Sequence, residues 1–207
     1  MKIIALEGID GCGKTTLVDE LAKAFDGDAR VVFLHTPIAP FRELRQSLNP
    51  ANKAETFWFY QASNSHLART LSSDRVYVLD RFIYSTYIAH RSADPAVSGL
   101  IDTSFALLQL PVPIKTYLIR VSLATSWQRI HQRGPLTESE KLGLAAYGQL
   151  YATYYNPQAI PIRDRLLRDW EILDNEMPDD LQRNLQNIES TIRQALESAV
   201  EKMPCPK

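Results

Sequence analysis

The sequence predicts an α/β protein whose mostly parallel central sheet is covered by helices on both faces. Short apolar runs alternate along the chain with stretches in which apolar residues recur at helical spacing. Two polar motifs, Gly8–Thr15 and Asp80-Arg81, each follow an apolar run directly. Ligands of such sheets bind at the carboxyl ends of the strands, so both motifs are expected at one edge of the sheet.

The expected strands are short runs rich in Ile, Val, Leu and aromatic residues. These residue types favour the buried strands of a parallel sheet, where both faces are covered. The runs are Lys2–Leu6, Arg30–His35, Arg75–Asp80, Ile114–Val121 and Trp170–Leu173.

Helices are expected between these strands, where apolar residues repeat every three or four positions. The first ends near Gly27, and Ser122 is expected to cap a helix that runs through Ile130. An acidic first turn near Pro178 suits the start of the last helix. The remaining helices are expected at Phe41–Leu48, Ala54–Leu71, Ile83–Arg91, Ser98–Gln109 and Glu138–Tyr155.

The composition is that of one folded domain, expected to span residues 1–207. Hydrophobic residues make up 45% and charged residues 23%, and no repeat or linker divides the chain. The formal net charge of −1 argues against broad binding to nucleic acid or to an anionic membrane. No apolar run approaches the roughly 18 residues of a membrane span. Without a signal peptide, and with Cys12 and Cys205 poorly placed for a disulfide, a cytoplasmic location is expected.

Residues Gly8–Thr15 (GIDGCGKT) match the phosphate-binding pattern G-x-x-x-x-G-K-[ST] in full, between an expected strand and an expected helix. In such a loop the backbone N–H groups and the helix N-terminus bind phosphate oxygens. Lys14 is expected to reach the β- and γ-phosphates of ATP, and the Thr15 hydroxyl to bind Mg²⁺. A glycine-rich turn without a ligand is the alternative. The residues expected to bind ATP are Gly8, Asp10, Gly11, Cys12 (also a small residue that fills the loop), Gly13, Lys14, Thr15 and Thr16.

Asp80 and Arg81 form the second motif, in VYVLDRFIYS. An acid beside the phosphate loop is placed to hold Mg²⁺ or to orient an acceptor oxygen, and the planar guanidinium of Arg81 suits a phosphate. The alternative is a salt bridge that only stabilises the end of the strand. Thr15 and Asp80 are therefore the expected metal site, and Lys14, Asp80 and Arg81 are expected to be catalytic.

Three motifs follow one another in a characteristic order. Leu6–Thr16 fits EG[IL][DE]GxGKTT, Asp80–Ser85 fits DR[YFH]xxS, and the arginine-containing stretch Trp127–Gly134 ends in RG. This order resembles the thymidylate kinase family of nucleoside monophosphate kinases. The resemblance implies a P-loop kinase fold with a mobile lid at residues 129–141, and the use of ATP and Mg²⁺ to convert dTMP to dTDP. It also implies a homodimer.

The resemblance gives roles to individual residues. Asp10 is similar to a loop acid that contacts the acceptor sugar hydroxyl, and Arg81 to the arginine that binds the acceptor monophosphate. Phe59 is similar to the aromatic residue that stacks on the acceptor base. The loop offers no basic residue between Asp10 and Gly13, so the catalytic arginine is expected in the lid. The candidates are Arg129 and Arg133.

Several positions depart from the family pattern. Ser63 stands where the family places an arginine that faces the base, and Gln61 and Asn64 are alternatives for base recognition. Arg42 and Arg45 are both placed to contact the acceptor phosphate, and Arg45 is the substrate-binding candidate, with an exposed helix face as the alternative. The tyrosines expected either to pack inside the protein or to form a dimer face are Tyr147, Tyr151, Tyr154 and Tyr155.

Two other functions are compatible with the motifs. A deoxynucleoside kinase has a similar acid-glycine start and an E-R-S-x-Y-S segment, in which case Glu7 would accept the proton of a sugar hydroxyl. Asp10 and Asp80 favour a monophosphate acceptor over that alternative. The other is a regulator that only binds a nucleotide, although Asn52–Glu55 (NKAE) does not provide the N-K-x-D base motif of GTPases.

Overall fold

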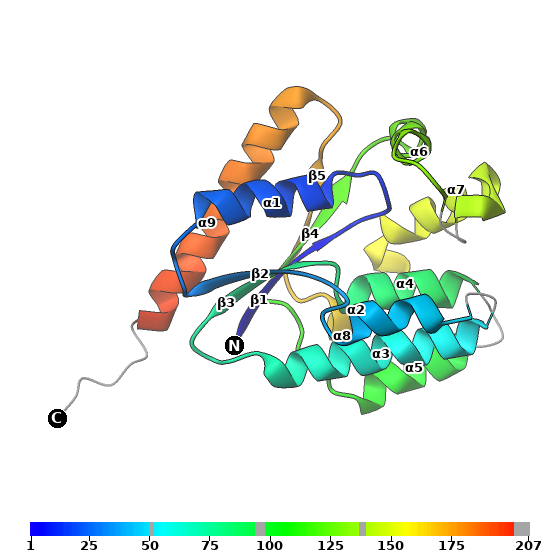
Figure 1. Cartoon of the computed structure of the whole chain (residues 1–207), viewed down its shortest axis with the longest axis horizontal. Helices are drawn as coiled ribbons and strands as arrows, with labels where there is room; N and C mark the ends of the chain where they lie inside the picture. Colours follow the sequence, from blue (N-terminus) through cyan, green and yellow to red (C-terminus); the bar gives the residue numbers. More distant parts are fainter. Residues whose placement is uncertain (50–51, 94–97, 137–139, 201–207) are drawn as a thin grey trace.

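The computed structural model describes residues 1–49, 52–93, 98–136 and 140–200, and these residues contain one sheet of five parallel strands (Figure 1). The strand order is β2-β3-β1-β4-β5, so the first strand lies in the middle and later strands flank it on both sides. In such sheets ligands bind at the carboxyl edge, where the strand order reverses. The strands are β1 (Lys2–Glu7), β2 (Val31–His35), β3 (Val76–Asp80), β4 (Lys115–Arg120) and β5 (Trp170–Asp174).

The strand register brings the carboxyl ends of β1, β2 and β3 to the same level. Leu6 in β1 is the register partner of Asp80 in β3, and His35 in β2 is a partner of the same residue. Partner residues on neighbouring strands point to the same face of a sheet. The sheet therefore brings His35 and Asp80 together, next to the loop that follows β1.

Helices cover both faces of the sheet (Figure 1). Helices α1 and α9 pack against each other on one face, and α3, α4 and α5 lie together on the other. Helices α6 and α7 lie beyond the carboxyl edge. The α-helices are α1 (Lys14–Ala24), α2 (Phe41–Leu44), α3 (Lys53–Thr70), α4 (Ile83–Ala93), α5 (Ser98–Leu107), α6 (Leu123–Gln132), α7 (Leu144–Tyr154), α8 (Arg163–Leu166) and α9 (Pro178–Val200), and the 3-10 helices are η1 (Arg45–Ser47), η3 (Glu140–Leu142) and η4 (Pro157–Ala159).

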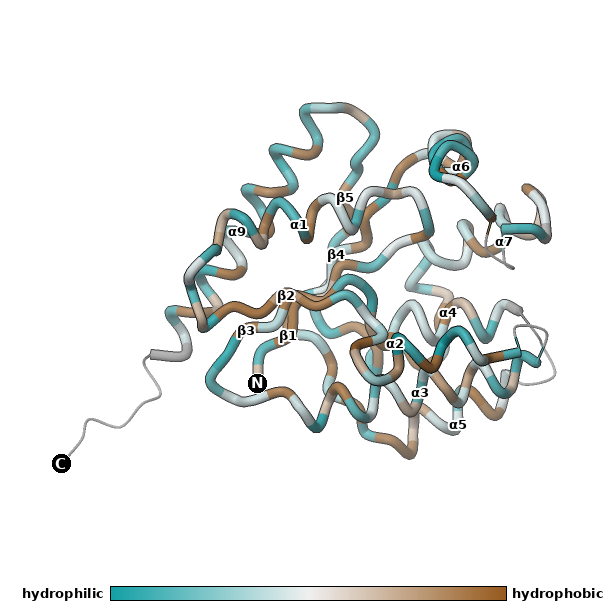
Figure 2. The backbone as a smooth tube through the Cα atoms, viewed as in Figure 1, coloured by the Kyte–Doolittle hydropathy of each residue, from teal (hydrophilic) through white to brown (hydrophobic). Residues whose placement is uncertain are grey.

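The strands form the centre of the hydrophobic core. Every residue of β3 is buried, and in β1 only the first residue is partly exposed. Figure 2 shows hydrophobic segments along the central strands, whereas α9 alternates between hydrophobic and hydrophilic residues. Ile188 and Ile192 of α9 are buried, as the helical spacing of its apolar residues predicts. In the part of the chain that the structure describes, no helix combines the length and the apolar character needed to cross a membrane.

The predicted strands are all present, with boundaries within one residue of those expected. The helix expected at Phe41–Leu48 is instead the short α2 followed by η1, and α8 was not expected.

One helix boundary needs a larger correction. The helix expected from Glu138 begins only at Leu144, because Gly143 adopts a positive-φ conformation (φ 88°) that separates η3 from α7. Residues 137–139, which include part of the expected lid, lie outside the described residues.

Candidate active site

The phosphate loop runs from the end of β1 into α1, and its three glycines have backbone conformations that other residues rarely adopt. They are Gly8 (φ 150°), Gly11 (φ 73°) and Gly13 (φ 96°). A Cβ atom on Gly11 would lie 2.8 Å from the backbone oxygen of Ser126 in α6, and a Cβ atom on Gly13 would collide with the side chain of Asn175. Asn175 also donates a hydrogen bond to the Cys12 carbonyl at 2.9 Å. The glycines thus allow α6 and the segment after β5 to pack directly against the loop.

Helices α6 and α7 hold other carbonyl groups of the loop from outside. The hydroxyls of Ser126 and Tyr147 donate hydrogen bonds to the Asp10 carbonyl, at 2.6 and 2.9 Å. Arg129 donates to the Gly11 carbonyl at 3.3 Å. These donors hold the carbonyl groups of Asp10 and Gly11 and so fix the path of the loop backbone.

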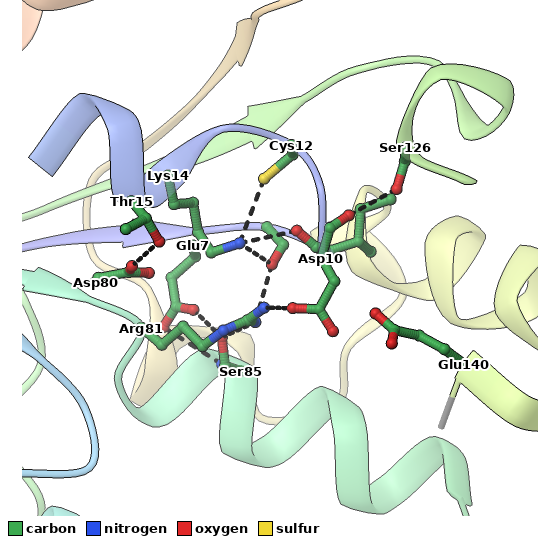
Figure 3. Close-up of polar contacts among 12 residues, drawn as sticks. Glu7, Asp10, Cys12, Lys14, Thr15, Asp80, Arg81, Ser85, Ser126 and Glu140 are labelled. Carbon is green, nitrogen blue, oxygen red and sulfur yellow. Dashed lines mark hydrogen bonds and ion pairs between the residues drawn. The ribbon is translucent and has the colours of Figure 1, made fainter. Parts of the chain in front are cut away.

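Lys14 is folded back onto the loop and is buried. Its Nζ atom donates to the carbonyl oxygens of Gly8 (2.9 Å) and Ile9 (2.8 Å) and lies 3.4 Å from Cys12 Sγ (Figure 3). Within the described residues, the backbone N–H groups of residues 10–13 donate no hydrogen bond. The ammonium group and these N–H groups are the donors that this loop offers to phosphate oxygens. Cys12 is buried, which fits a small residue that fills the loop.

Asp80 and Thr15, the expected metal-binding pair, are in direct contact (Figure 3). The Thr15 hydroxyl donates a hydrogen bond to Asp80 Oδ2 at 2.8 Å, which leaves the lone pairs of the hydroxyl oxygen for a cation. The other oxygen, Asp80 Oδ1, is buried and has no hydrogen-bond partner among the described residues. A buried oxygen of this kind is unfavourable unless a ligand or water meets it.

The donor set fits Mg²⁺ in particular. The described residues contain no group of three or more metal-ligating side chains that would hold an ion alone. Mg²⁺ is usually bound by one or two protein oxygens together with nucleotide phosphates, so the pair Thr15 and Asp80 is sufficient. Thr16, the next residue of the motif, is exposed in the first turn of α1.

Arg81 has a left-handed backbone conformation (φ 67°), which costs a residue with a side chain about 1–2 kcal/mol. Its guanidinium donates to the Gly8 carbonyl at 3.0 Å and to the Ser85 hydroxyl at 3.3 Å, and it pairs with the Asp10 carboxylate (Figure 3). Arg81 therefore pairs with the phosphate loop and not with its neighbour Asp80. The alternative of a local Asp80–Arg81 salt bridge is wrong for this structure.

Asp10 lies among three cationic side chains. Burial alone would raise the pKa of its carboxyl group, but the positive charges of Arg81, Lys14 and Arg133 outweigh burial and lower the pKa below its usual value. Asp10 is thus ionised at neutral pH and holds Arg81 against the loop.

Glu7, the last residue of β1, is buried and connects β1 to the start of α4. Its Oε1 accepts hydrogen bonds from the N–H groups of Phe82 (2.9 Å) and Ser85 (3.3 Å). Its Oε2 accepts from the hydroxyls of Ser85 and Tyr154, the latter at 3.0 Å. Burial raises the pKa of Glu7, and these donors offset the rise only in part. Because both oxygens are engaged, Glu7 positions the segment after Arg81 and offers no free oxygen to a sugar hydroxyl.

The substitution Glu7→Gln is expected to change how stability depends on pH. A raised pKa means that the folded protein binds this proton more tightly than the unfolded chain, so the carboxyl group destabilises the fold as the pH rises above its usual pKa of 4.5. The free energy of unfolding of the wild type, minus that of Glu7→Gln, should therefore fall from pH 4.5 toward neutrality. Urea unfolding of both proteins measures this difference. A difference that rises with pH would contradict the account.

Arg129 and Arg133, the two lid candidates, make different contacts. Arg129 in α6 donates to the Gly11 carbonyl and so contacts the outside of the loop. Arg133, just after α6, pairs with Glu140, a buried carboxylate that points toward the Asp10 side of the loop in Figure 3. The charge of Arg133 also lowers the pKa of Asp10, so this guanidinium lies close to the phosphate-binding side.

The expected acceptor-base site lies on α3. Positions 59, 63 and 66 share one face of this helix. The ring of Phe41 in α2 contacts two side chains of this face. It meets the ring of Phe59 edge-on, with ring centres 5.5 Å apart, and its centre lies 5.6 Å from that of the His66 ring. Ser63, between them, is 3% exposed. Arg45 in η1 is exposed, and its side chain makes no hydrogen bond or ion pair with the described residues.

The alternatives for base recognition are used in helix packing instead. Gln61 donates to Ser104 of α5 at 3.0 Å, and Asn64 donates to Thr86 of α4 at 3.0 Å. Both side chains are buried. They connect α3 to its two neighbours and are not solvated, whereas Gln61 Oε1 is buried without a hydrogen-bond partner among the described residues.

The tyrosines of α7 also serve packing. Tyr147 and Tyr154 are buried, and the hydroxyls of Tyr151 and Tyr155 donate to backbone carbonyls at the end of β4 and just after it. Of the two alternatives for these residues, the contacts support internal packing.

Four residues that contact the site were not predicted from the sequence to belong to it: Ser126, Tyr147, Asn175 and His35. His35 had a usable signal, because its strand ends on a polar residue just as the strand of Asp80 does. Ser126, Tyr147 and Asn175 had none, because they contact the loop from segments 116, 137 and 163 residues away in the sequence.

Comparison with known proteins places the chain in a family. A family model described as thymidylate kinase matches residues 6–159. A probable thymidylate kinase of Archaeoglobus fulgidus is 29% identical over 148 residues, which cover 68% of this chain and 74% of that protein.

Two solved structures share the fold. A deoxyadenosine kinase from M. mycoides has a TM-score of 0.65 at 19% identity, with 93% of this chain and 99% of the other covered. A thymidylate kinase from Ehrlichia chaffeensis has a TM-score of 0.64 at 19% identity, with 93% and 98% covered.

The family model spans most of the chain, and the matched residues include the phosphate loop, Asp80 and Arg81. The P-loop kinase fold and the enzyme class expected from the sequence are thereby confirmed. The chain belongs to the thymidylate kinase family and is a nucleoside monophosphate kinase.

Proposed function

We propose that the protein transfers the γ-phosphoryl group of ATP to a nucleoside monophosphate, with dTMP as the preferred acceptor. The position of Arg81 is the observation that carries the proposal. Its left-handed backbone turns the guanidinium toward Gly8 and Asp10 of the phosphate loop. A planar cation at this point suits a second phosphate group. A nucleoside has no phosphate and would leave this arginine without a ligand.

The donor site is the loop with the N-terminus of α1. The free N–H groups of residues 10–13 bind phosphate oxygens of ATP, and Lys14 exchanges the Gly8 and Ile9 carbonyls for the β- and γ-phosphates. Phosphoryl transfer mainly needs in-line positioning and positive charge around the transferred group. Lys14 supplies one such charge.

Thr15 and Asp80 hold Mg²⁺ together with the nucleotide. When bound, the ion neutralises charge on the transferred phosphoryl group and orients the phosphates. The Thr15 hydroxyl offers its lone pairs while its O–H group donates a hydrogen bond to Asp80 Oδ2, and Asp80 Oδ1, which has no partner among the described residues, is the other available oxygen.

The acceptor lies between Arg81 and α3. Arg81 binds its phosphate, Asp10 contacts a sugar hydroxyl, and the base stacks on Phe59. Ser63 lies one helical turn after Phe59, beside the proposed position of the base. Because serine is small and uncharged, the acceptor base is selected by shape more than by a charged contact. Arg45, which is exposed, is proposed as a further contact to the acceptor phosphate.

Arg133 is the proposed catalytic arginine of the lid. It lies near Asp10 and is held by a buried carboxylate, whereas Arg129 contacts the outside of the loop. Arg129 is assigned to holding the loop and the bound ATP.

A nucleoside kinase is the second candidate, because a deoxyadenosine kinase shares the fold. That reaction needs a base for the sugar hydroxyl, and Glu7 is the residue that would act so. Glu7 is fully buried, and both of its oxygens accept hydrogen bonds. This favours the monophosphate acceptor.

A coupled assay of ADP release tests the proposal. The enzyme receives ATP and Mg²⁺ with thymidine, dTMP or other nucleoside monophosphates. Turnover with dTMP and none with thymidine is expected. Turnover with a nucleoside alone would reject the proposal, and tight ATP binding without turnover on any acceptor would favour a regulator.

Three further expectations stay predictions: a single domain over residues 1–207, a homodimer and a cytoplasmic location. One hydrophobic cluster contains buried residues from Ile3 to Leu196, which supports the single domain. Light scattering after size-exclusion chromatography tests the homodimer, and cell fractionation tests the location.

A further inference from the structure

His35 lies at the end of β2 with a carboxylate on each side of its ring. Its Nδ1 is 3.2 Å from Asp80 Oδ2, and its Nε2 is 3.3 Å from Asp19 Oδ1 in α1. His35 and Asp80 are register partners on neighbouring parallel strands, so the sheet itself brings them together. Asp19 lies one turn after Thr15, and its contact therefore links the ring to the helix that begins at the phosphate loop.

The two oxygens of Asp80 have different surroundings. Oδ2 accepts a hydrogen bond from Thr15 at 2.8 Å and faces His35 Nδ1, whereas Oδ1 is buried without a partner among the described residues. A carboxylate with one oxygen held by two neighbours has its second oxygen fixed as well. Such fixed ligands bind an ion more strongly, because less orientational freedom is lost on binding.

We propose that His35 is a positioning residue for the metal–nucleotide complex: its ring holds Asp80 Oδ2 so that Oδ1 and the Thr15 hydroxyl oxygen face the bound Mg²⁺. The inference rests on the proposed nucleotide site and adds a residue to it. It predicts that replacing His35 weakens the binding of ATP that is complexed with Mg²⁺. Metal-free ATP is held by the loop N–H groups and Lys14, so its affinity does not depend on His35.

Two substitutions separate the two ring nitrogens. The amide nitrogen of asparagine lies near the position of histidine Nδ1, and that of glutamine lies near Nε2. His35→Asn therefore places an N–H group next to Asp80 and removes the contact with Asp19. His35→Gln places an N–H group next to Asp19 and removes the contact with Asp80. Each variant is the matched control of the other, because both lack the ring.

The test is isothermal titration calorimetry of ATP binding, with Mg²⁺ and with EDTA, for the full-length wild type and both variants. The factor by which Mg²⁺ tightens ATP binding is expected to fall by about tenfold in His35→Gln and by less than about threefold in His35→Asn. ATP affinity in EDTA is expected to be the same in all three proteins.

An unchanged Mg²⁺ factor in His35→Gln, or an equal loss in both variants, would overturn the inference. The proposed metal site is tested separately by the wild type. If Mg²⁺ does not tighten ATP binding there, that site is wrong and the inference falls with it. The His35 side chain is 41% exposed, so both variants are expected to fold, and ATP binding in EDTA verifies that the loop is intact.

Discussion

Arg81→Ala is expected to lower kcat/KM for dTMP by about 100- to 1,000-fold, while KM for ATP changes by less than about threefold. The guanidinium offers two parallel N–H donors to the acceptor phosphate, and hydrogen bonds to charged groups contribute roughly 1.5–3 kcal/mol each. ATP binds through the loop and does not use this side chain. Steady-state kinetics with each substrate varied in turn measures both effects.

Two control variants separate the side chain of Arg81 from its backbone. At φ 67° alanine is strained, whereas glycine is not, so Arg81→Gly removes the guanidinium without backbone strain. Arg81→Lys keeps the charge without the planar pair of donors and is expected to recover part of the activity. If Arg81→Gly keeps the wild-type kcat/KM for dTMP, Arg81 does not bind the acceptor.

Arg133→Ala is expected to lower kcat by about 1,000-fold with little change in either KM. An arginine that contacts the transferred phosphoryl group stabilises charge that develops only in the transition state, which contributes roughly 10³–10⁵ in kcat. Arg129→Ala is expected to raise KM for ATP instead, because Arg129 contacts the loop carbonyl of Gly11. The same steady-state assay compares the two variants.

The pair Arg129 and Arg133 forms its own control, since both are arginines at the end of one helix. A fall in kcat with Arg129→Ala and only a rise in KM with Arg133→Ala would reverse the assignment. Arg133→Lys keeps a positive charge and is expected to retain more activity than Arg133→Ala.

The local parts of the site were predictable from the sequence because they depend on residues close together in the chain. The phosphate loop between β1 and α1 has its full pattern in eight consecutive residues, Gly8–Thr15. The end of β3 at Asp80 follows from an apolar run that stops at an acid. Parallel strands then bring both motifs to one edge, so their proximity was predictable as well.

The partners of these residues were not predictable, because they come from distant segments. Asp10 and Arg81 are 71 residues apart in sequence, yet they pair. Arg81 turns away from Asp80 because its backbone is left-handed. This conformation is rare for an arginine, and the sequence contains no signal that predicts it. Likewise, the sequence shows that Ser63 replaces an arginine, but not that Phe41 from α2 lies against Phe59 and His66 on the same helix face.

The central claim is that the acceptor is a nucleoside monophosphate whose phosphate is bound by Arg81. A competition experiment tests most directly whether the acceptor is a monophosphate. The wild-type enzyme receives ATP and Mg²⁺ with equal amounts of dTMP and thymidine, and ³¹P NMR follows the products. The account predicts that dTMP is consumed and that the two phosphorus signals of dTDP appear together with those of ADP. A dTMP signal that grows without any dTDP would show that thymidine is the acceptor, and it would contradict the account.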